Sequence, residues 1–137
     1  MSATLTLTIL TPQRKLIERE NVLELFAPGF KGQLNILPGH ADFVTELETG
    51  IIRWRSSAGW RQAIVSTGLL QIFSQEITVL AEVSELSEEV DMKRAKVAQE
   101  KAKQKIEEGG LDDANFRKYQ LKLQRATARI GVTGMDG

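Results

Sequence analysis

The stretch ITVLAEVSELSEEVDMKRAKVA (residues 77–98) contains a change of periodicity that decides the fold. Before this change, apolar and polar residues alternate, as they do in half-buried β-strands. From Ser87 onward the chain is rich in Ala, Lys and Glu, and Ser87 is followed by acidic residues that favour a helix N-terminus. We therefore expect a β domain over residues 1–86 and a helical domain over residues 87–137, with Ser87 as the helix N-cap.

The first domain consists of short alternating segments separated by turn residues. In residues 4–9, Leu5, Leu7 and Ile9 face one way and three threonines face the other, which predicts a half-buried strand. Gly68 is expected to break a later strand. Turn residues at positions 56–59 and 74–76 predict two β-hairpins. This pattern is typical of an antiparallel β-sandwich or barrel.

The second domain reads as two helices separated by a pair of glycines at positions 109–110. The second helix is expected to begin at a cap at Asp112 or Asp113 and to run to about Ile130, with Gly131 beyond its end. The apolar stripes that would face each other are Ala95, Ala98, Ala102 and Ile106 on the first helix and Phe116, Tyr119, Leu123, Ala126 and Ile130 on the second. Because alanine buries little area, we expect a weakly stabilised hairpin that can leave its base. A permanently docked hairpin is the alternative.

Composition limits the classes of function. The 137 residues carry 18 Lys and Arg and 18 Asp and Glu, so the formal net charge is zero. The basic excess of the helical half is too small to indicate a nucleic-acid partner. The chain has no cysteine, so neither a disulfide nor thiolate chemistry is expected. No apolar run approaches the roughly 18 residues of a membrane span, so we expect any membrane association to be indirect.

No constellation of residues predicts an enzyme or a metal site. His40 is the only histidine, and a turn histidine bonded to nearby backbone is a better interpretation than a metal ligand. Neither a nucleophile elbow nor a Walker loop is present. Trp54 and Trp60 leave one alternative function open, a free-standing sandwich module that binds carbohydrate or peptide. Their other interpretation is as core or cross-strand residues.

The run GQLNILPGHA (residues 32–41), followed by LETG (residues 47–50), closely resembles the signature of the ε subunits of F-type ATP synthases, called δ in mitochondria. The resemblance covers nearly the whole chain. It implies an α+β fold in which an N-terminal antiparallel β-sandwich of about ten short strands precedes a C-terminal antiparallel two-helix hairpin. It also implies a non-catalytic rotor subunit of the central stalk in a proton- or sodium-translocating enzyme.

The same resemblance implies partners for each domain. The sandwich would bind the γ subunit and the c-ring, with Gln33 and His40 as candidate c-ring contacts. The hairpin would extend toward the catalytic α/β subunits and inhibit ATP hydrolysis by bringing basic residues to an acidic loop of β. The candidates are Arg117, Lys118, Lys122, Arg125 and Arg129, whose other interpretation is a solvated helix face. The implied location is peripheral, on the cytoplasmic face of a bacterial plasma membrane or the stromal face of thylakoids.

Some bacterial members of this family bind ATP through an (Ile/Leu)-Asp-x-x-Arg-Ala motif, and residues 90–95 read VDMKRA. No cofactor is implied as a requirement, but ATP is implied as a regulatory ligand. The matching residues are Glu85, Asp91, Arg94, Ala95, Arg125 and Arg129, and Val90 departs from the motif, which has Ile or Leu there. Lys101 stands where the family has an arginine, and it lacks the planar fork of donors that an arginine offers a phosphate. The other interpretation is that Asp91 supports the helix start and Arg94 makes a local pair.

Overall fold

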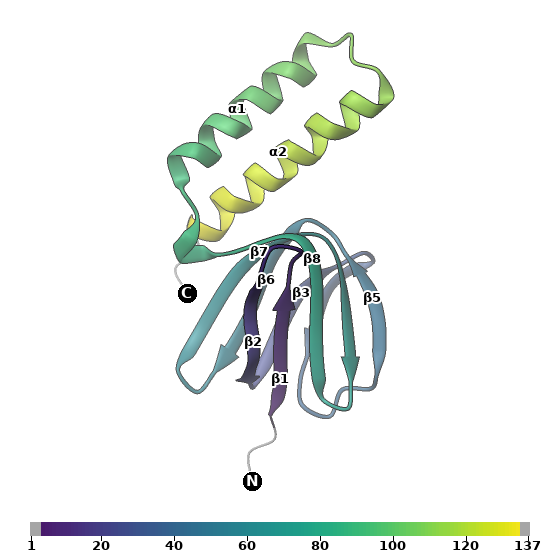
Figure 1. The fold of residues 1–137 in the computed structure, drawn as a ribbon, viewed down its shortest axis with the longest axis vertical. Helices are drawn as coiled ribbons and strands as arrows, with labels where there is room; N and C mark the ends of the chain where they lie inside the picture. The colour runs from purple at the N-terminus through teal and green to yellow at the C-terminus, as the bar shows by residue number, and fades with distance from the viewer. Residues whose placement is uncertain (1–3, 135–137) are drawn as a thin grey trace.

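In the computed structural model, which describes residues 4–134, eight strands form a two-layered β-sandwich and two helices form a hairpin at one end of it (Figure 1). The strands are β1 (Leu5–Leu10), β2 (Lys15–Val22), β3 (Glu24–Gly29), β4 (Gly32–Ile36), β5 (Phe43–Leu47), β6 (Gly50–Ser56), β7 (Gly59–Phe73) and β8 (Glu76–Leu86). A short 3-10 turn, η1 (Ser87–Glu89), leads to α1 (Met92–Glu108) and α2 (Asp113–Gly134). The expected order of a sandwich followed by a helical hairpin is confirmed.

Strands β7 and β8 are long, and each contributes to both layers. The first half of β7 pairs with β6, and after Gly68 its second half pairs with β5. The predicted break at Gly68 is therefore wrong, because the strand bends there and continues. Thr67 adopts a left-handed conformation with a φ of 55°. At Gly68 a Cβ would lie 2.7 Å from the carbonyl oxygen of Leu80, so only glycine fits this close approach of β7 to β8.

The strand order is β2-β1-β8-β7-β5-β3-β4, and β6 pairs with β3 and β7. Because β7 and β8 each span two layers, the domain has eight strands within residues 4–134 instead of about ten short ones. One pair, β1 with β8, is parallel, and the remaining pairs of this region are antiparallel. Both predicted hairpin turns are present, at positions 57–58 and 74–75.

The core lies between the two layers and is built from the inward side of the alternating strands. Leu5, Leu7 and Ile9 are fully buried, as their alternation predicts. Trp54 of β6 is the largest fully buried side chain. Its indole Nε1 donates a hydrogen bond to the carboxylate of Glu20 on β2, so the one polar atom of this side chain has a partner inside the sandwich.

The helices differ from the sequence expectation at two termini and agree with it at a third. Ser87 is not the N-cap of α1; Asp91 is, and its carboxylate accepts a hydrogen bond from the backbone N–H of Arg94 at 3.1 Å. Asp112 caps the start of α2 by accepting from the N–H of Asn115 at 2.8 Å, as one of the two alternatives predicts. The end of α2 lies at Gly134 and not near Ile130, because its last turns pack against the sandwich, where Val132 is buried.

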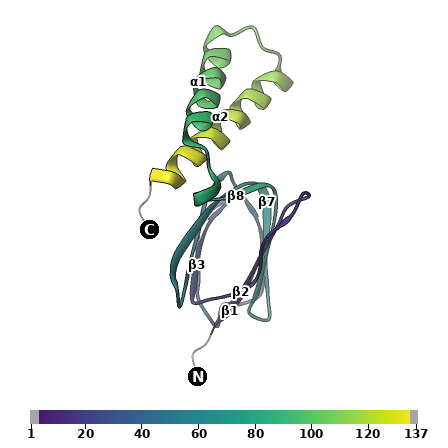
Figure 2. The same cartoon turned by 60° about the vertical axis from the view of Figure 1, so that its left-hand side comes forward.

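The hairpin projects away from the sandwich and meets it through the C-terminal half of α2 (Figure 2). Between the helices Ala95, Ala102 and Ala126 are buried, as predicted, whereas Ala98 and Phe116 are exposed. The buried part of the helix pair is therefore made mainly of alanines. Within residues 4–134, neither helix combines the length and the hydropathy of a membrane span.

Candidate functional site

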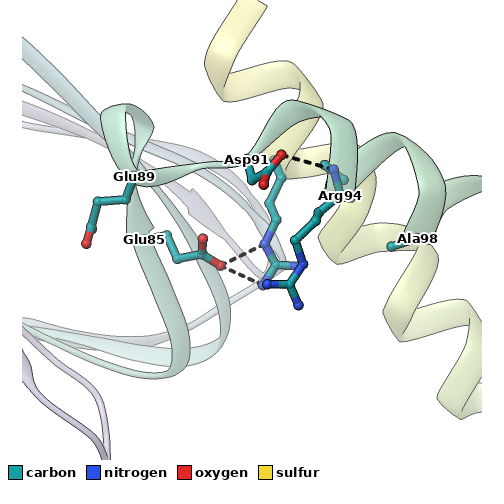
Figure 3. A pocket seen from close by; sticks show the side chains of 7 residues that line it. Glu85, Glu89, Asp91, Arg94 and Ala98 are labelled. Atoms are coloured by element: carbon teal, nitrogen blue, oxygen red, sulfur yellow. Dashed lines mark hydrogen bonds and ion pairs between the residues drawn. The ribbon is translucent and has the colours of Figure 1, made fainter.

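The segment that joins the sandwich to α1 encloses a cavity of about 290 Å³. It is lined by Glu85, Glu89, Asp91, Arg94, Ala95, Ala98 and Arg129. In Figure 3 the side chains of Glu85 and Arg94 face the same space, whereas that of Glu89 turns away. The carboxylates of Glu85 and Asp91 and the guanidinium groups of Arg94 and Arg129 line this space, so it can bind a ligand that has both donors and acceptors.

A second and larger cavity, of about 620 Å³, lies between the two helices. Ala98 and Arg129 line both cavities, so the two adjoin. The charged residues of the second cavity are Lys101, Lys105, Glu108, Lys122, Arg125 and Arg129. Five cations against one carboxylate make this groove strongly basic, which is the setting that phosphate groups prefer.

The structure brings most of the residues matched to the ATP motif to these two cavities. Five of them, Glu85, Asp91, Arg94, Ala95 and Arg129, line the first, and Lys101, Arg125 and Arg129 line the second. Val90 lines neither. Among the lining residues that the motif did not select, Ala98 and Lys105 each lie four residues beyond a selected residue, one helical turn along the same face.

Arg125 and Arg129 of α2 bind the sandwich directly. Arg129 donates from Nε to Glu85 at 2.7 Å, and its Nη2 lies 2.7 Å from the same carboxylate. Arg125 donates to Ser66 Oγ at 2.7 Å and to Glu82 at 3.0 Å. From the sequence, both arginines were expected to bind a ligand or a partner or to lie on a solvated helix face. They are also the polar anchors that hold the hairpin on the sandwich in this state.

Glu89 binds the segment that joins the sandwich to α1 to the turn between β1 and β2. Arg14, in the turn between β1 and β2, donates to its two carboxylate oxygens at 2.6 and 2.9 Å. These hydrogen bonds hold the pKa of Glu89 below its ordinary value, against the opposing effect of burial, and a bond from the backbone N–H of Leu86 acts in the same direction. The same pairing raises the pKa of Arg14. The pair thus fixes the point where the chain leaves the sandwich.

Glu89→Gln should destabilise the protein slightly at neutral pH and not at all in strong acid. A carboxylate whose pKa is lowered by folding contributes stability above its unfolded-state pKa, near 4.5, and loses it as the pH falls through the folded-state value. Because the two side chains are 43% and 33% exposed, the loss at pH 7 should stay below about 1 kcal/mol. Urea unfolding of both proteins from pH 7 to pH 3 measures this, with Glu100→Gln on the solvent face of α1 as the control. A difference that persists undiminished at pH 3 would contradict the assignment.

The remaining predicted contacts are dispersed. Arg117, Lys118 and Lys122 are exposed on α2. Gln33 lies on β4 near Gly29, which pairs with Leu47 at one end of β5, whereas the ring of His40 packs at a tilt against Phe43 at the other end of β5. The structure therefore does not bring Gln33 and His40 together.

The turn around His40 is held to the β7–β8 hairpin by Gln75, a residue that the sequence analysis did not select. Its side-chain amide accepts from the N–H of Gly39 at 2.6 Å and donates to the carbonyl of His40 at 3.2 Å. The imidazole Nδ1 lies 2.7 Å from the carbonyl oxygen of Ala41, which fits a turn histidine bonded to backbone. Within residues 4–134 no three His, Asp or Glu side chains gather in a group that could hold a metal ion.

The tryptophans do not support the alternative function. A carbohydrate- or peptide-binding module would need both rings at the surface, but Trp54 is fully buried. Trp60 is 36% exposed and stacks on Phe26, with ring centroids 6.0 Å apart. The two residues are a core residue and a cross-strand residue respectively.

Comparison with known proteins accounts for both domains. Residues 4–87 match the β-sandwich domain of the ATP synthase delta/epsilon chain, and residues 88–134 match its long α-helix domain. The chain is 35% identical to the ATP synthase epsilon chain of Bdellovibrio bacteriovorus over 126 residues, 90% of each chain. It is 32% identical to that of Geotalea daltonii over 137 residues, which cover 100% of this chain and 99% of the relative.

Two solved structures share the fold. A chain of the Euglena gracilis mitochondrial ATP synthase, solved with OSCP, F1 and c-ring, aligns with a TM-score of 0.80 at 21% identity over 92% of this chain and 79% of that one. A chain of the Tetrahymena thermophila central stalk and c-ring aligns with a TM-score of 0.61 at 13% identity, covering 94% of this chain and 96% of that one. With the family match over residues 4–134, the chain belongs to the ATP synthase delta/epsilon chain family.

Proposed function

We propose that this protein is a non-catalytic subunit of the central stalk of an F-type ATP synthase, in which the sandwich binds the γ subunit and the c-ring and the hairpin restrains ATP hydrolysis. Family membership and the c-ring complexes that contain proteins of this fold support the role. In this role the domain boundary lies at residues 86–87, and the protein is peripheral to the membrane through its complex, on the cytoplasmic face of a bacterial plasma membrane or the stromal face of thylakoids. Gln33 and His40 are the proposed c-ring contacts, at two separate points of the sandwich.

The observation that carries the regulatory part is the limited contact between hairpin and sandwich. Only the C-terminal half of α2 makes a large contact with β6 and β7, and much of this contact is polar. A small interface of this kind, in which ion pairs accompany the burial of Val132, separates docked and released states by only a few kcal/mol. When released, Arg125 and Arg129 join the already exposed Arg117, Lys118 and Lys122 on one helix, available to an acidic surface of the β subunit.

Copurification tests the central-stalk role. A tagged full-length copy should retain the cognate γ subunit and should inhibit ATP hydrolysis by a catalytic head that lacks its own ε subunit. Removal of residues 87–137 in the assembled complex should abolish inhibition while the sandwich stays bound to γ. Failure of the full-length protein to bind γ would overturn the proposal.

We also propose ATP as a regulatory ligand of the docked hairpin. The adjoining cavities suit a nucleotide, because the mixed-charge one can bond a base or ribose and the basic groove can bind phosphates. Both arginines that would bind phosphate are already oriented by sandwich carboxylates, and the guanidinium group has five donors, enough for both partners.

Arg94→Ala should weaken ATP binding about tenfold or more, because a charge-assisted hydrogen bond is worth about 1.5–3 kcal/mol. Isothermal titration of the isolated protein with millimolar ATP measures this. Lys93→Ala is the matched control, since Lys93 is exposed on the same turn and is not among the residues that line either cavity. Absence of binding heat in the unmodified protein would remove ATP from the proposal, and equal affinity in both variants would remove Arg94 from the site.

A further inference from the structure

The turn between β5 and β6 lies against the bend of β7. Its residues 47–50 read LETG, the second part of the family signature. The last residue of β5 pairs with Gly68, and the first residue of β6 pairs with the residue before Ser66. The turn therefore lies opposite the two residues of the bend, Ser66 and Thr67. These are the two sandwich residues whose hydroxyl groups accept hydrogen bonds from Arg125 of α2.

The turn is held in place from its other side by β3. The backbone N–H of Glu48 donates to the carbonyl oxygen of Pro28 at 2.8 Å. A Cβ on Gly50 would lie 2.9 Å from the Cβ of Pro28, so a larger residue cannot enter there unless the turn moves. Thr49 lies between these two contacts, and its Oγ1 is 2.8 Å from Ser66 Oγ. The hydroxyl group of Thr49 therefore has a fixed position beside the bend.

The surroundings of the Ser66 hydroxyl determine where its proton points. Within residues 4–134, the side chain of Ser66 has two hydrogen-bond partners, Thr49 Oγ1 and the Nε of Arg125. Arg125 can only donate, so it uses a lone pair of Ser66 Oγ. Ser66 is fully buried, and a buried hydroxyl proton without an acceptor is costly, so the proton goes to Thr49. Thr49 thus holds the lone pair of Ser66 toward helix α2.

Arg125 is held by three hydrogen bonds that leave part of its guanidinium group for a ligand. Nε donates to Ser66 at 2.7 Å, and Nη2 donates to Glu82 at 3.0 Å and to Thr67 at 3.4 Å. Within residues 4–134 these partners use three of the five donors and leave the two N–H groups of Nη1. Arg125 lines the basic groove between the helices, so Nη1 is the nitrogen available to an anion there. A guanidinium group that is already oriented loses little freedom when a phosphate binds.

We propose that Ser66 and Thr49 are positioning residues for the phosphate-binding side of Arg125, so that the signature turn raises the affinity of the docked hairpin for ATP without contacting the nucleotide. This inference rests on the proposed role of ATP as a regulatory ligand. Neither Ser66 nor Thr49 is among the residues that line the two ligand cavities, so both act through Arg125. Their expected contribution is that of one ordinary hydrogen bond, about a three- to tenfold change in affinity.

Substitutions of Thr49 test the proposal in the full-length protein. Thr49→Val nearly keeps the shape of the side chain but removes the acceptor of the Ser66 proton, so ATP binding should weaken about three- to tenfold in isothermal titration. Thr49→Ser keeps the hydroxyl group and should bind ATP as the unmodified protein does. Thr78→Val is the matched control, since Thr78 is half-buried near the first residue of β8, whereas the hairpin follows the last.

A second measurement separates positioning of Arg125 from a general weakening of hairpin docking. The apparent affinity for a ligand of the docked hairpin falls in proportion to the docked fraction. Energy transfer between dyes on cysteines introduced at the exposed positions Ser57 and Lys103 measures that fraction, and the chain has no cysteine of its own. A positioning role predicts that Thr49→Val weakens ATP binding by more than the loss of docked fraction explains. A purely structural role predicts equal changes in the two quantities.

A double-mutant cycle tests whether Thr49 acts through Ser66. Thr49→Val should weaken ATP binding in the unmodified protein but not in the Ser66→Ala variant, because the intermediate hydroxyl group is then already absent. Additive effects of the two substitutions overturn the positioning role and leave ATP as a ligand. The same holds if Thr49→Val binds ATP as Thr78→Val does, if its affinity only follows the docked fraction, or if Thr49→Ser binds as weakly as Thr49→Val. An unmodified protein that does not bind ATP overturns the proposed ligand and, with it, this inference.

Discussion

Trp54→Ala should lower the free energy of unfolding by about 3–5 kcal/mol, the usual result of removing a large aromatic ring from a core. Trp54 is fully buried, and its Nε1 donates to Glu20, which also accepts from Arg61 at 2.7 Å. The substitution leaves a cavity between the layers and removes one hydrogen bond from Glu20. Urea unfolding followed by far-ultraviolet circular dichroism measures the loss without depending on the deleted fluorophore.

Trp60→Ala is the matched control for this prediction. Trp60 lies on the outside of the sandwich, where it stacks on Phe26 and lies under the guanidinium of Arg53 at 4.8 Å. Its loss should cost about 1 kcal/mol, as for other exposed aromatic and cation–π contacts. A Trp54 variant that is no less stable than the Trp60 variant would contradict the placement of Trp54 in the core.

Glu85→Gln should raise the population of released hairpin about 5- to 30-fold. The Glu85–Arg129 pair has two short N–O distances, but its side chains are 28% and 26% exposed, so its loss should cost about 1–2 kcal/mol. That change corresponds to the stated factor in an equilibrium constant. Hydrogen–deuterium exchange of the last turns of α2 should rise accordingly, and inhibition of ATP hydrolysis should strengthen.

Two further variants test whether the Glu85–Arg129 ion pair is what holds the hairpin. Glu24→Gln weakens a different ion pair of the sandwich, that with Arg55 at 3.5 Å, and should leave the hairpin unaffected. Arg129→Ala releases the hairpin as Glu85→Gln does but also removes a cation proposed to bind the β subunit, so inhibition should weaken. Unchanged exchange in α2 after Glu85→Gln would show that this ion pair does not hold the hairpin.

The periodicity of the chain predicted most of the fold because the interior is built from local alternation. Leu5, Leu7 and Ile9 needed only their period of two to be placed in the core. The prediction that the strand breaks at Gly68 was wrong because a glycine can mark either the end of a strand or a close approach of two backbones. Here Gly68 permits the approach of β7 to the backbone of β8. Nothing local to Gly68 distinguishes a strand end from a bend that carries the strand into the second layer.

The prediction that Ser87 caps the first helix was wrong for a related reason. Ser87 and Asp91 both suit an N-cap and both precede acidic or helix-forming residues. The choice was made by the tertiary contacts of the joining segment, in which Glu89 is bonded to Arg14 in the turn after β1 and to the backbone of Leu86. A partner 75 residues away in the sequence is not visible in a local pattern.

The sequence identified several residues that line the candidate site, but it did not show which of them pair with one another. The motif at residues 90–95 and the resemblance to the family's ATP site selected seven of the fifteen residues that line the two cavities. That Arg125 and Arg129 also pair with Glu82 and Glu85 was not predictable, because it depends on where α2 crosses the bend of β7 and the end of β8.

By itself, the sequence determined the two-domain order, the inward faces of the strands and the alanine-rich seam of the hairpin, because each follows from residues close together in the chain. Only the tertiary structure decided that β7 and β8 serve both layers, that Asp91 begins the first helix, and that two arginines fasten the hairpin to the sandwich. These features join residues 40 or more positions apart or depend on how closely two backbones approach, and such contacts are chosen by the packing of the whole chain.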